Sequence, residues 1–260
     1  MATRFILINT SHAGNVGAAA RAMKVMGFDD LVLVAPRWPD VLAREETLQR
    51  ASGAGDVLAK ARIVATLDEA LDGVTYLCAT AMTPRDFGPP TAAPREHLGS
   101  IAASPHHVAF LFGSERFGMS NDDVYRCHVA LTIPTDPRYG SLNLAAAIQV
   151  IAYEWRTALG GFSTPVAADA NRAGVGFDRL SPNGDGADEV MLADAQSVAG
   201  MLAHWERALQ DIGFLDPAAP KKLMPRLNQL FNRAQLTPEE IHILRGVAKA
   251  MSEARSRPKR

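Results

Sequence analysis

Four short stretches of the sequence each combine small residues with polar side chains that could bind or orient a ligand. These stretches are NTSHAGNVGAAAR at 9–21, ATAMTPR at 79–85, GSERFGMS at 113–120 and YGSLN at 139–143. Glycine lets a backbone come close to a bound molecule. Arginine grips phosphate or carboxylate groups with its planar fork, and asparagine, serine and glutamate offer further hydrogen bonds. We therefore interpret the four stretches as parts of one binding site.

Each stretch by itself has a simpler interpretation. Gly14 and Gly17 could be ordinary turn glycines, Arg21 a surface residue of a helix, and Glu115 with Arg116 a solvated ion pair. Four loops of the same kind are harder to explain in this way. The familiar patterns G-x-G-x-x-G after the first strand-like run, G-x-x-x-x-G-K-[ST], H-E-x-x-H and G-x-S-x-G do not occur. Their absence argues against nicotinamide, phosphate-loop and zinc-hydrolase chemistry.

Each of the four stretches follows a short apolar run rich in residues that favour strands. Strand-like runs lie at 4–9, 31–35, 62–66, 74–80, 107–113 and 129–133. Helix-like segments separate them, and a long apolar helix pattern closes the series from about Leu142 to Leu159. Such alternation predicts an α/β fold with a mostly parallel sheet covered by helices on both faces. In such sheets, ligands bind outside the carboxyl ends of the strands, where the four stretches would lie.

The composition changes near residue 160. We predict a first domain at 1–160, a linker rich in glycine and aspartate at 161–187, and a basic helical extension at 188–260. Helical periodicity in the extension runs over 188–212, 217–232 and 237–254. Thr237 and Pro238 have the residue types of an N-cap and a first helical position, so they mark the start of the last helix.

The charge of the chain is balanced overall but not locally. Among 260 residues, 27 basic side chains stand against 28 acidic ones. Any affinity for a polyanion must therefore be local. Residues 221–260 contain ten Lys and Arg against three Glu. This excess predicts contacts with RNA phosphates, although a solvated helix face with a basic end explains it equally well.

Targeting and redox signals point to one compartment. The N-terminal residues do not resemble a signal peptide, and no apolar run is long enough to cross a membrane. We therefore expect a cytoplasmic protein with no membrane partner. Cys78 and Cys127 belong to no C-x-x-C pattern, which fits reduced, buried thiols. His106, His107 and His128 adjoin strand-like runs and are interpreted as structural.

Three segments resemble those of a known enzyme class. SHAGNVGAAARAMKVMGF, FLFGSERFGMSN and IPTDPRYGSLNLAAAIQVIAYE are similar to motifs 1, 2 and 3 of the SPOUT-class 2′-O-ribose RNA methyltransferases of the TrmH type. The resemblance covers about residues 4–158. With LNQLFNRAQLTPEEIHILRGV in the extension, it looks closest to the TrmJ subgroup of tRNA methyltransferases. The resemblance implies a trefoil knot that threads residues 133–156, a rare exception to the rule against threaded chains.

The resemblance also implies S-adenosyl-L-methionine as the cofactor and no metal. It assigns the cofactor pocket to Thr80, Ala81, Met82, Gly113, Ile133, Gly140, Ser141 and Leu142. It assigns catalytic positions to Arg21, Asn15, Glu115, Ser141 and Asn143. Because a guanidinium group stays protonated in proteins, we interpret Arg21 as a clamp on phosphate and on the emerging alkoxide rather than as the base.

The implied reaction is methylation of the ribose 2′-hydroxyl of cytidine or uridine at nucleotide 32 of the tRNA anticodon loop. The implied partners are tRNA and a second copy of the chain, but not DNA. Three alternatives stay open: another tRNA or rRNA nucleotide, an α/β nucleotide-binding enzyme outside methyl transfer, and a noncatalytic RNA-binding protein. For the dimer, the helix at 142–159 offers Ala145, Ile148, Ala152 and Leu159, which could instead pack on their own sheet.

Overall fold

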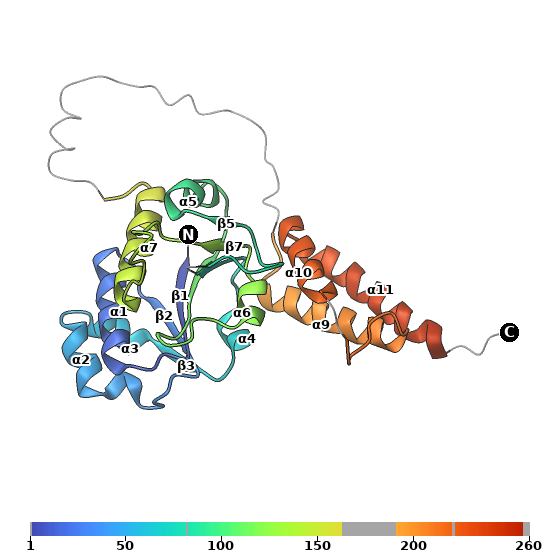
Figure 1. The fold of residues 1–260 in the computed structure, drawn as a ribbon, viewed down its shortest axis with the longest axis horizontal. Coiled ribbons are helices and arrows are strands. Elements are labelled where there is room, and N and C mark those ends of the chain that lie inside the picture. The colour runs from blue at the N-terminus through green and yellow to red at the C-terminus, as the bar shows by residue number, and fades with distance from the viewer. Residues whose placement is uncertain (1, 82, 163–190, 220–221, 257–260) are drawn as a thin grey trace, which may run out of the picture.

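The structure of the chain is a computed structural model. It describes residues 2–81, 83–162, 191–219 and 222–256, so nearly all of the predicted linker lies outside the described residues. Figure 1 shows an α/β part that contains the N-terminal strand, and a group of helices from the C-terminal third of the chain beside it. Within the described ranges, no helix is both long and apolar enough to cross a membrane.

Seven strands of the described chain form one sheet in the order β3-β2-β1-β6-β4-β7-β5, and every neighbouring pair is parallel. They are β1 (Thr3–Ile8), β2 (Asp30–Val34), β3 (Arg62–Val64), β4 (Tyr76–Thr80), β5 (Thr91–Ala92), β6 (Val108–Phe112) and β7 (Val129–Leu131). The predicted α/β fold is confirmed. Six strands agree with the predicted runs to within two residues at each end, and the two-residue β5 is additional.

Helices cover both faces of the sheet. The helices of this part are α1 (Ala13–Val25), α2 (Glu45–Ala51), α3 (Gly55–Lys60), α4 (Leu67–Ala70), α5 (Pro94–Ala102), α6 (Asn121–Tyr125) and α7 (Leu144–Ala158), with a 3₁₀ helix η1 (Val41–Ala43). On β1, Phe5 and Leu7 are buried with residues of α1, α3, α5 and α7. Ile6 and Ile8 point the other way and are buried with residues of α4 and α6. This alternation follows from the pleat, which turns successive side chains to opposite faces.

The first glycine-containing stretch differs from the prediction. Helix α1 begins at Ala13, so Gly14 and Gly17 lie inside the helix rather than in a turn. A Cβ atom at Gly17 would lie 2.0 Å from the backbone oxygen of Thr47 in α2. Gly17 therefore permits close packing of two helices, and its interpretation as a residue for ligand approach or as a turn glycine is wrong.

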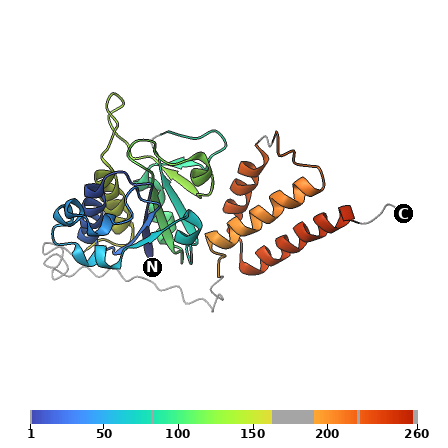
Figure 2. The ribbon, with the colours of Figure 1, turned by 90° about the horizontal axis from the view of Figure 1, so that it is seen from below.

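The described residues of the extension form three helices: α9 (Ala195–Asp211), α10 (Leu223–Ala234) and α11 (Pro238–Ser256). Figure 2 shows them together on one side of the α/β part. Their own small core includes Met201, Leu202 and Phe231. The predicted start of α11 is confirmed, because Thr237 Oγ1 accepts a hydrogen bond from Glu240 N at 3.3 Å and Glu240 Oε2 accepts one from Thr237 N at 2.8 Å.

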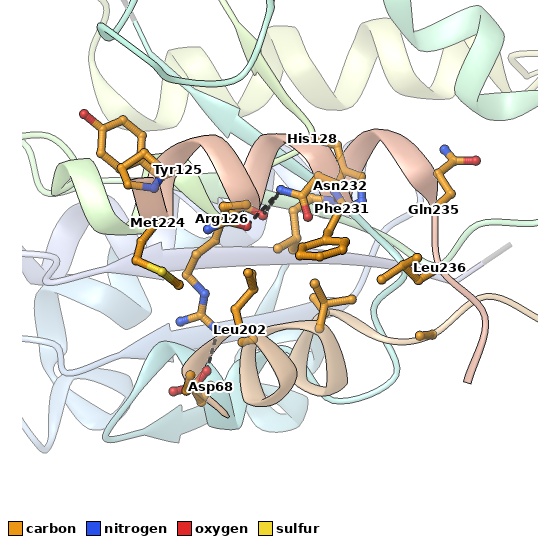
Figure 3. Close-up of a pocket in the computed structure, with 18 of the residues that line it drawn as sticks. Asp68, Tyr125, Arg126, His128, Leu202, Met224, Phe231, Asn232, Gln235 and Leu236 are labelled. Carbon is orange, nitrogen blue, oxygen red and sulfur yellow. Dashed lines mark hydrogen bonds and ion pairs between the residues drawn. The ribbon is translucent and has the colours of Figure 1, made fainter. Parts of the chain in front are cut away.

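The extension packs against the α/β part through α9 and α10. Asn232 of α10 is buried and donates from Nδ2 to the backbone oxygens of Arg126 at 3.1 Å and Cys127 at 3.3 Å (Figure 3). At the start of α9, Ala195 N donates to Val74 O at 2.7 Å. A cavity of about 290 Å³ lies between the two parts (Figure 3). Its mostly apolar lining and its position away from the four predicted stretches mark it as part of the contact between the two parts rather than as the catalytic site.

The cysteines and two histidines are structural, as predicted. Cys78 and Cys127 are buried and free, and burial raises the pKa of both thiols. His128 is stacked on Tyr76 with ring centroids 4.5 Å apart, and its Nδ1 accepts a hydrogen bond from Leu77 N at 3.1 Å. Burial lowers the pKa of His128 to about 4, so this ring is neutral. His106 is also buried, beside Thr75.

Candidate active site

The four predicted stretches follow four adjacent strands of the sheet. β1, β6, β4 and β7 are neighbours in the sheet order, and all run parallel. Their carboxyl ends therefore meet at one edge, and the loops that leave these ends can build one site. The loop after β6 is closed by two backbone hydrogen bonds between Ser114 and Gly118, at 3.1 and 2.9 Å. This closure places Glu115 in a short, tight loop.

Glu115 joins two of the stretches. One carboxylate oxygen accepts hydrogen bonds from the backbone N of Ser11 at 2.8 Å and from its hydroxyl at 2.6 Å. The other accepts one from Asn15 Nδ2 at 2.8 Å. Asn15 Oδ1 in turn accepts a long hydrogen bond from Asn143 Nδ2 at 3.4 Å. The structure thus brings together Glu115, Asn15 and Asn143 from three stretches.

These hydrogen bonds control the charge of Glu115. Partial burial acts to raise the pKa of its carboxyl, but the hydrogen bonds from Asn15 and Ser11 outweigh burial and hold the pKa below its ordinary value. Glu115 is therefore ionised at neutral pH and is a weak base. Its geometry suits it to orient Asn15, not to accept a proton.

The Glu115 cluster makes a pH-dependent contribution to stability. We expect Glu115→Gln to lower the free energy of unfolding at pH 7 by about 1–3 kcal/mol, because charged acceptors make the stronger hydrogen bonds. The lowered pKa means that this contribution is complete above the ordinary glutamate value of 4.5 and is lost as the pH falls through the pKa of folded Glu115. Urea unfolding of both proteins at pH 7, 5 and 4 measures the difference. Glu96→Gln, at an exposed glutamate, is the control, and equal stability of Glu115→Gln and wild type at pH 7 would contradict the assignment.

Asn143 has a local role as well. It is the N-cap of α7, and its Oδ1 accepts a hydrogen bond from Ala145 N at 2.9 Å. Asparagine is among the best N-cap residues because its short side chain satisfies an otherwise free N–H group. The same side chain therefore starts the helix and reaches Asn15.

A cavity of about 340 Å³ lies at this edge of the sheet. Its lining includes seven of the eight predicted cofactor residues, namely Thr80, Ala81, Gly113, Ile133, Gly140, Ser141 and Leu142. The eighth, Met82, lies outside the described residues. Glu115 also lines the cavity, so the seven predicted cofactor residues share one space with two predicted catalytic residues, Glu115 and Ser141, the latter belonging to both sets.

The cavity lining also includes residues that the resemblance does not assign. Thr83, Arg85 and Phe117 line it, and Phe117 is 82% exposed. All three lie within the four predicted stretches. Their position directly after β4 and β6 was therefore the signal in the sequence that could have identified them as cavity residues. The motifs did not indicate which side chains of these stretches face the cavity.

Arg21 does not line the described cavity of its own chain. It is the ninth residue of α1 and is exposed. The start of α1 at Ala13 puts Arg21 in the third turn of the helix.

Both parts of the chain match known protein families. Residues 2–153 match the SpoU rRNA Methylase family, and residues 196–260 match the C-terminal domain of the tRNA methyltransferase TrmJ. The chain is 42% identical to the tRNA (cytidine/uridine/adenosine-2′-O-)-methyltransferase TrmJ of Pseudomonas aeruginosa over 94% of this chain and 91% of that protein. The chain belongs to the TrmJ family. The predicted SPOUT-class resemblance is confirmed.

Further TrmJ proteins match over nearly the full length. TrmJ of Yersinia pestis, a tRNA (cytidine/uridine-2′-O-)-methyltransferase, is 36% identical over 99% of this chain and 94% of its own. The crystal structure of TrmJ from Z. mobilis ZM4 has a TM-score of 0.77 and 30% identity, and the match covers 96% of this chain and 99% of that one. These relatives confirm the predicted enzyme class, a tRNA 2′-O-methyltransferase, and the fold.

The resemblance implied a dimer in which two copies of α7 pack together. The burial of residues on this helix shows which of its sides is free for such a contact. Ile148 and Ala152 are both 0% exposed and belong to the core of their own subunit. Their prediction as dimer contacts is wrong, and packing on their own sheet is correct. The free side of α7 instead carries Ala146 and Tyr153, the latter 52% exposed.

Proposed function

We propose that this chain methylates the ribose 2′-hydroxyl of cytidine or uridine at nucleotide 32 of the tRNA anticodon loop, with S-adenosyl-L-methionine as the methyl donor. The observation that carries the proposal is the single cavity that collects seven predicted cofactor residues beside Glu115. A tRNA substrate agrees with the expected cytoplasmic location. The proposed domains are the α/β part at 1–160 and the helical extension at 188–260.

The residues of the cavity fit such a cofactor. Thr80 Oγ1 is buried and has no hydrogen-bond partner in the described part of the chain, so it is free to bond a ligand. Thr132, directly after β7, donates from Oγ1 to Ala81 O at 2.8 Å and from its backbone N to Ala92 O at 3.0 Å. Thr132 is thus held between the two ends of the segment 81–92, as threading of the chain requires. These contacts support the proposed knot.

The chain's own residues would position the reactants. S-adenosyl-L-methionine supplies a methyl group carried on a sulfonium. The backbone of Gly140, Ser141 and Leu142 would hold the cofactor, while Glu115 fixes the amide of Asn15 toward the nucleotide. Holding two reactants in line is a large part of catalysis for such a transfer. Arg21 would bind the adjacent phosphate and stabilise the alkoxide while the hydroxyl passes its proton to solvent water, since neither Arg21 nor Glu115 is suited to accept it.

We also propose that the active unit is a homodimer. Support comes from the position of Arg21, which is exposed on α1 and does not line the cavity of its own chain. A twofold contact through the free side of α7 would bring a second chain to the site. Sedimentation of the protein at micromolar concentration tests this, and a monomer would contradict it.

The function is tested by mass spectrometry of nuclease-digested tRNA after incubation with labelled S-adenosyl-L-methionine. The expected product is labelled 2′-O-methylcytidine or 2′-O-methyluridine from the anticodon-loop fragment that contains nucleotide 32. A label on a base, or in another fragment, would redirect the proposal to a different substrate. No label in any tRNA would favour a noncatalytic RNA-binding protein.

The basic extension is proposed to contact RNA phosphates. Arg233 and Lys249 are exposed, on α10 and α11. We expect Arg233→Gln combined with Lys249→Gln to weaken tRNA binding and to reduce the slope of log affinity against log salt by roughly one unit per lost phosphate contact. Filter binding over a salt series measures both. The matched control, Arg50→Gln with Arg62→Gln on the α/β part, should keep the wild-type slope, and equal slopes for both pairs would contradict the role.

A further inference from the structure

A turn at residues 85–88 carries an arginine that the proposed reaction does not use. Arg85 lines the cofactor cavity together with Thr80 and Ile133. Its Nε is buried and lacks a hydrogen-bond partner within the described chain. A buried donor without a partner is costly, and a guanidinium keeps its positive charge. The cavity wall therefore presents a cationic donor that suits an anion.

The turn that carries Arg85 has a backbone conformation that needs support. Gly88 N donates to Arg85 O at 2.9 Å and closes the turn. Between them, Phe87 has a φ of +61°, in the left-handed region that large side chains rarely adopt. Such a conformation persists where surrounding contacts hold it in place.

The helical extension supplies these contacts from α10. Gln229 Nε2 donates to Phe87 O at 2.6 Å and also to Gly88 O. Lys222 Nζ lies 3.7 Å from the centroid of the Phe87 ring, and Arg226 Cζ lies 5.2 Å from it.

α10 itself is fixed on the α/β part by a second polar side chain. Asn232 lies three residues after Gln229, so both side chains are on the same face of the helix. Asn232 is bonded to the backbone just before β7 (Figure 3). One face of α10 therefore holds both the segment that leads into β7 and the turn that carries Arg85.

We propose that Arg85 binds an anionic group at the cofactor cavity and that Gln229 of the extension is the positioning residue for Arg85. The inference rests on the proposed function for the nature of the ligand. Two anions would reach this wall: the carboxylate on the methionine moiety of S-adenosyl-L-methionine, and a phosphate of the bound RNA. Both match the planar fork of a guanidinium group. With either anion, the extension helps to form the binding site at the cavity, because Gln229 holds the turn that carries Arg85. This role is separate from any contact of the extension with RNA.

Binding measurements on the full-length protein test this proposal. Arg85→Gln removes the charge at similar size, and Gln229→Glu removes both donors at nearly the same shape. Arg62→Gln and Gln196→Glu, at exposed positions of β3 and α9, are the matched controls. Calorimetry uses S-adenosylhomocysteine and 5′-methylthioadenosine, two thioethers of which only the first carries the amino-acid group with its carboxylate. Filter binding uses tRNA.

For a carboxylate ligand, Arg85→Gln should raise the Kd of S-adenosylhomocysteine about tenfold or more and leave that of 5′-methylthioadenosine unchanged. For a phosphate ligand, it should instead weaken tRNA binding and reduce its salt dependence. Gln229→Glu should change the same Kd in the same direction, and Arg85→Lys should restore part of the loss because it keeps the charge.

Three results would overturn the proposal or its parts. If Arg85→Gln binds S-adenosylhomocysteine, 5′-methylthioadenosine and tRNA with the same Kd values as Arg62→Gln, Arg85 does not bind an anion. If Gln229→Glu only lowers the melting temperature and leaves every Kd at the wild-type value, Gln229 is structural and not a positioning residue. If the wild-type protein binds neither thioether, the proposed function is wrong about the cofactor. The cofactor carboxylate is then also excluded as the anion that Arg85 binds.

Discussion

Replacing Arg21 with alanine is expected to lower single-turnover methylation of tRNA by about 10³-fold or more, because removal of a residue that stabilises developing charge has effects of this size. Cofactor affinity should stay within about twofold of wild type, since a residue outside the cavity makes no contact with its ligand. Arg21 is exposed and does not line the described cavity. For the same reason the melting temperature should hardly change.

Single-turnover kinetics and calorimetry separate the two effects of Arg21→Ala. Arg50→Ala, at an exposed position of the neighbouring α2, controls for the loss of one positive charge near α1. A variant that keeps most of its turnover would show that Arg21 is a surface residue. Loss of cofactor binding would show that Arg21 acts at the cavity and not on ribose and phosphate.

The second large effect is expected at Gly17. Gly17→Ala should lower the free energy of unfolding by about 3 kcal/mol or more, because the added methyl group overlaps backbone atoms rather than a flexible side chain. The new Cβ would lie 2.0 Å from Thr47 O and 2.8 Å from Ala51 N. Thr47 cannot withdraw easily, since it is fully buried and its hydroxyl donates to Val41 O at 2.6 Å and Ala13 O at 3.0 Å.

Denaturant unfolding measures the loss at Gly17. Gly99 offers a matched control, because it also lies inside a helix, α5, but has no atom within 4 Å of an added Cβ. Gly99→Ala should stabilise the protein by about 0.5–1 kcal/mol through higher helix propensity. If Gly17→Ala were as stable as Gly99→Ala, the close packing of α1 on α2 would be refuted. Since α1 carries Asn15 and Arg21, Gly17→Ala should also reduce activity.

The elements that the sequence did not reveal share a physical cause. α2 and α3 are short, and the segment that joins them contains Gly53. Only two residues of α2, Thr47 and Ala51, are buried, so the apolar periodicity is too weak to indicate a helix. Their stability comes from packing on α1, and Gly17 becomes informative only when that contact is known.

The candidate site shows the same division. The motifs placed Asn15, Glu115, Ser141 and Asn143 in sheet-end loops. The structure puts Asn15 in the first turn of α1 and brings the four segments together at one edge of the sheet. The motifs could not show that Glu115 accepts hydrogen bonds from Ser11 and Asn15, because the partners are 104 and 100 residues away in the sequence. The same holds for Gln229, whose carbonyl partners are 142 and 141 residues earlier.

The sequence by itself determined the parallel α/β fold, the boundaries of six strands to within two residues, the capping of α11, the enzyme family and seven residues that line one cavity. Each of these depends on local patterns: apolar runs, turn and cap residue types, and motif wording. Only the tertiary structure decided that Gly17 serves helix packing, that Ile148 and Ala152 face their own core, and that Arg21 does not line the described cavity. These facts depend on which surfaces meet after the chain folds, and burial, close approach and distant hydrogen bonds have no local signature in the sequence.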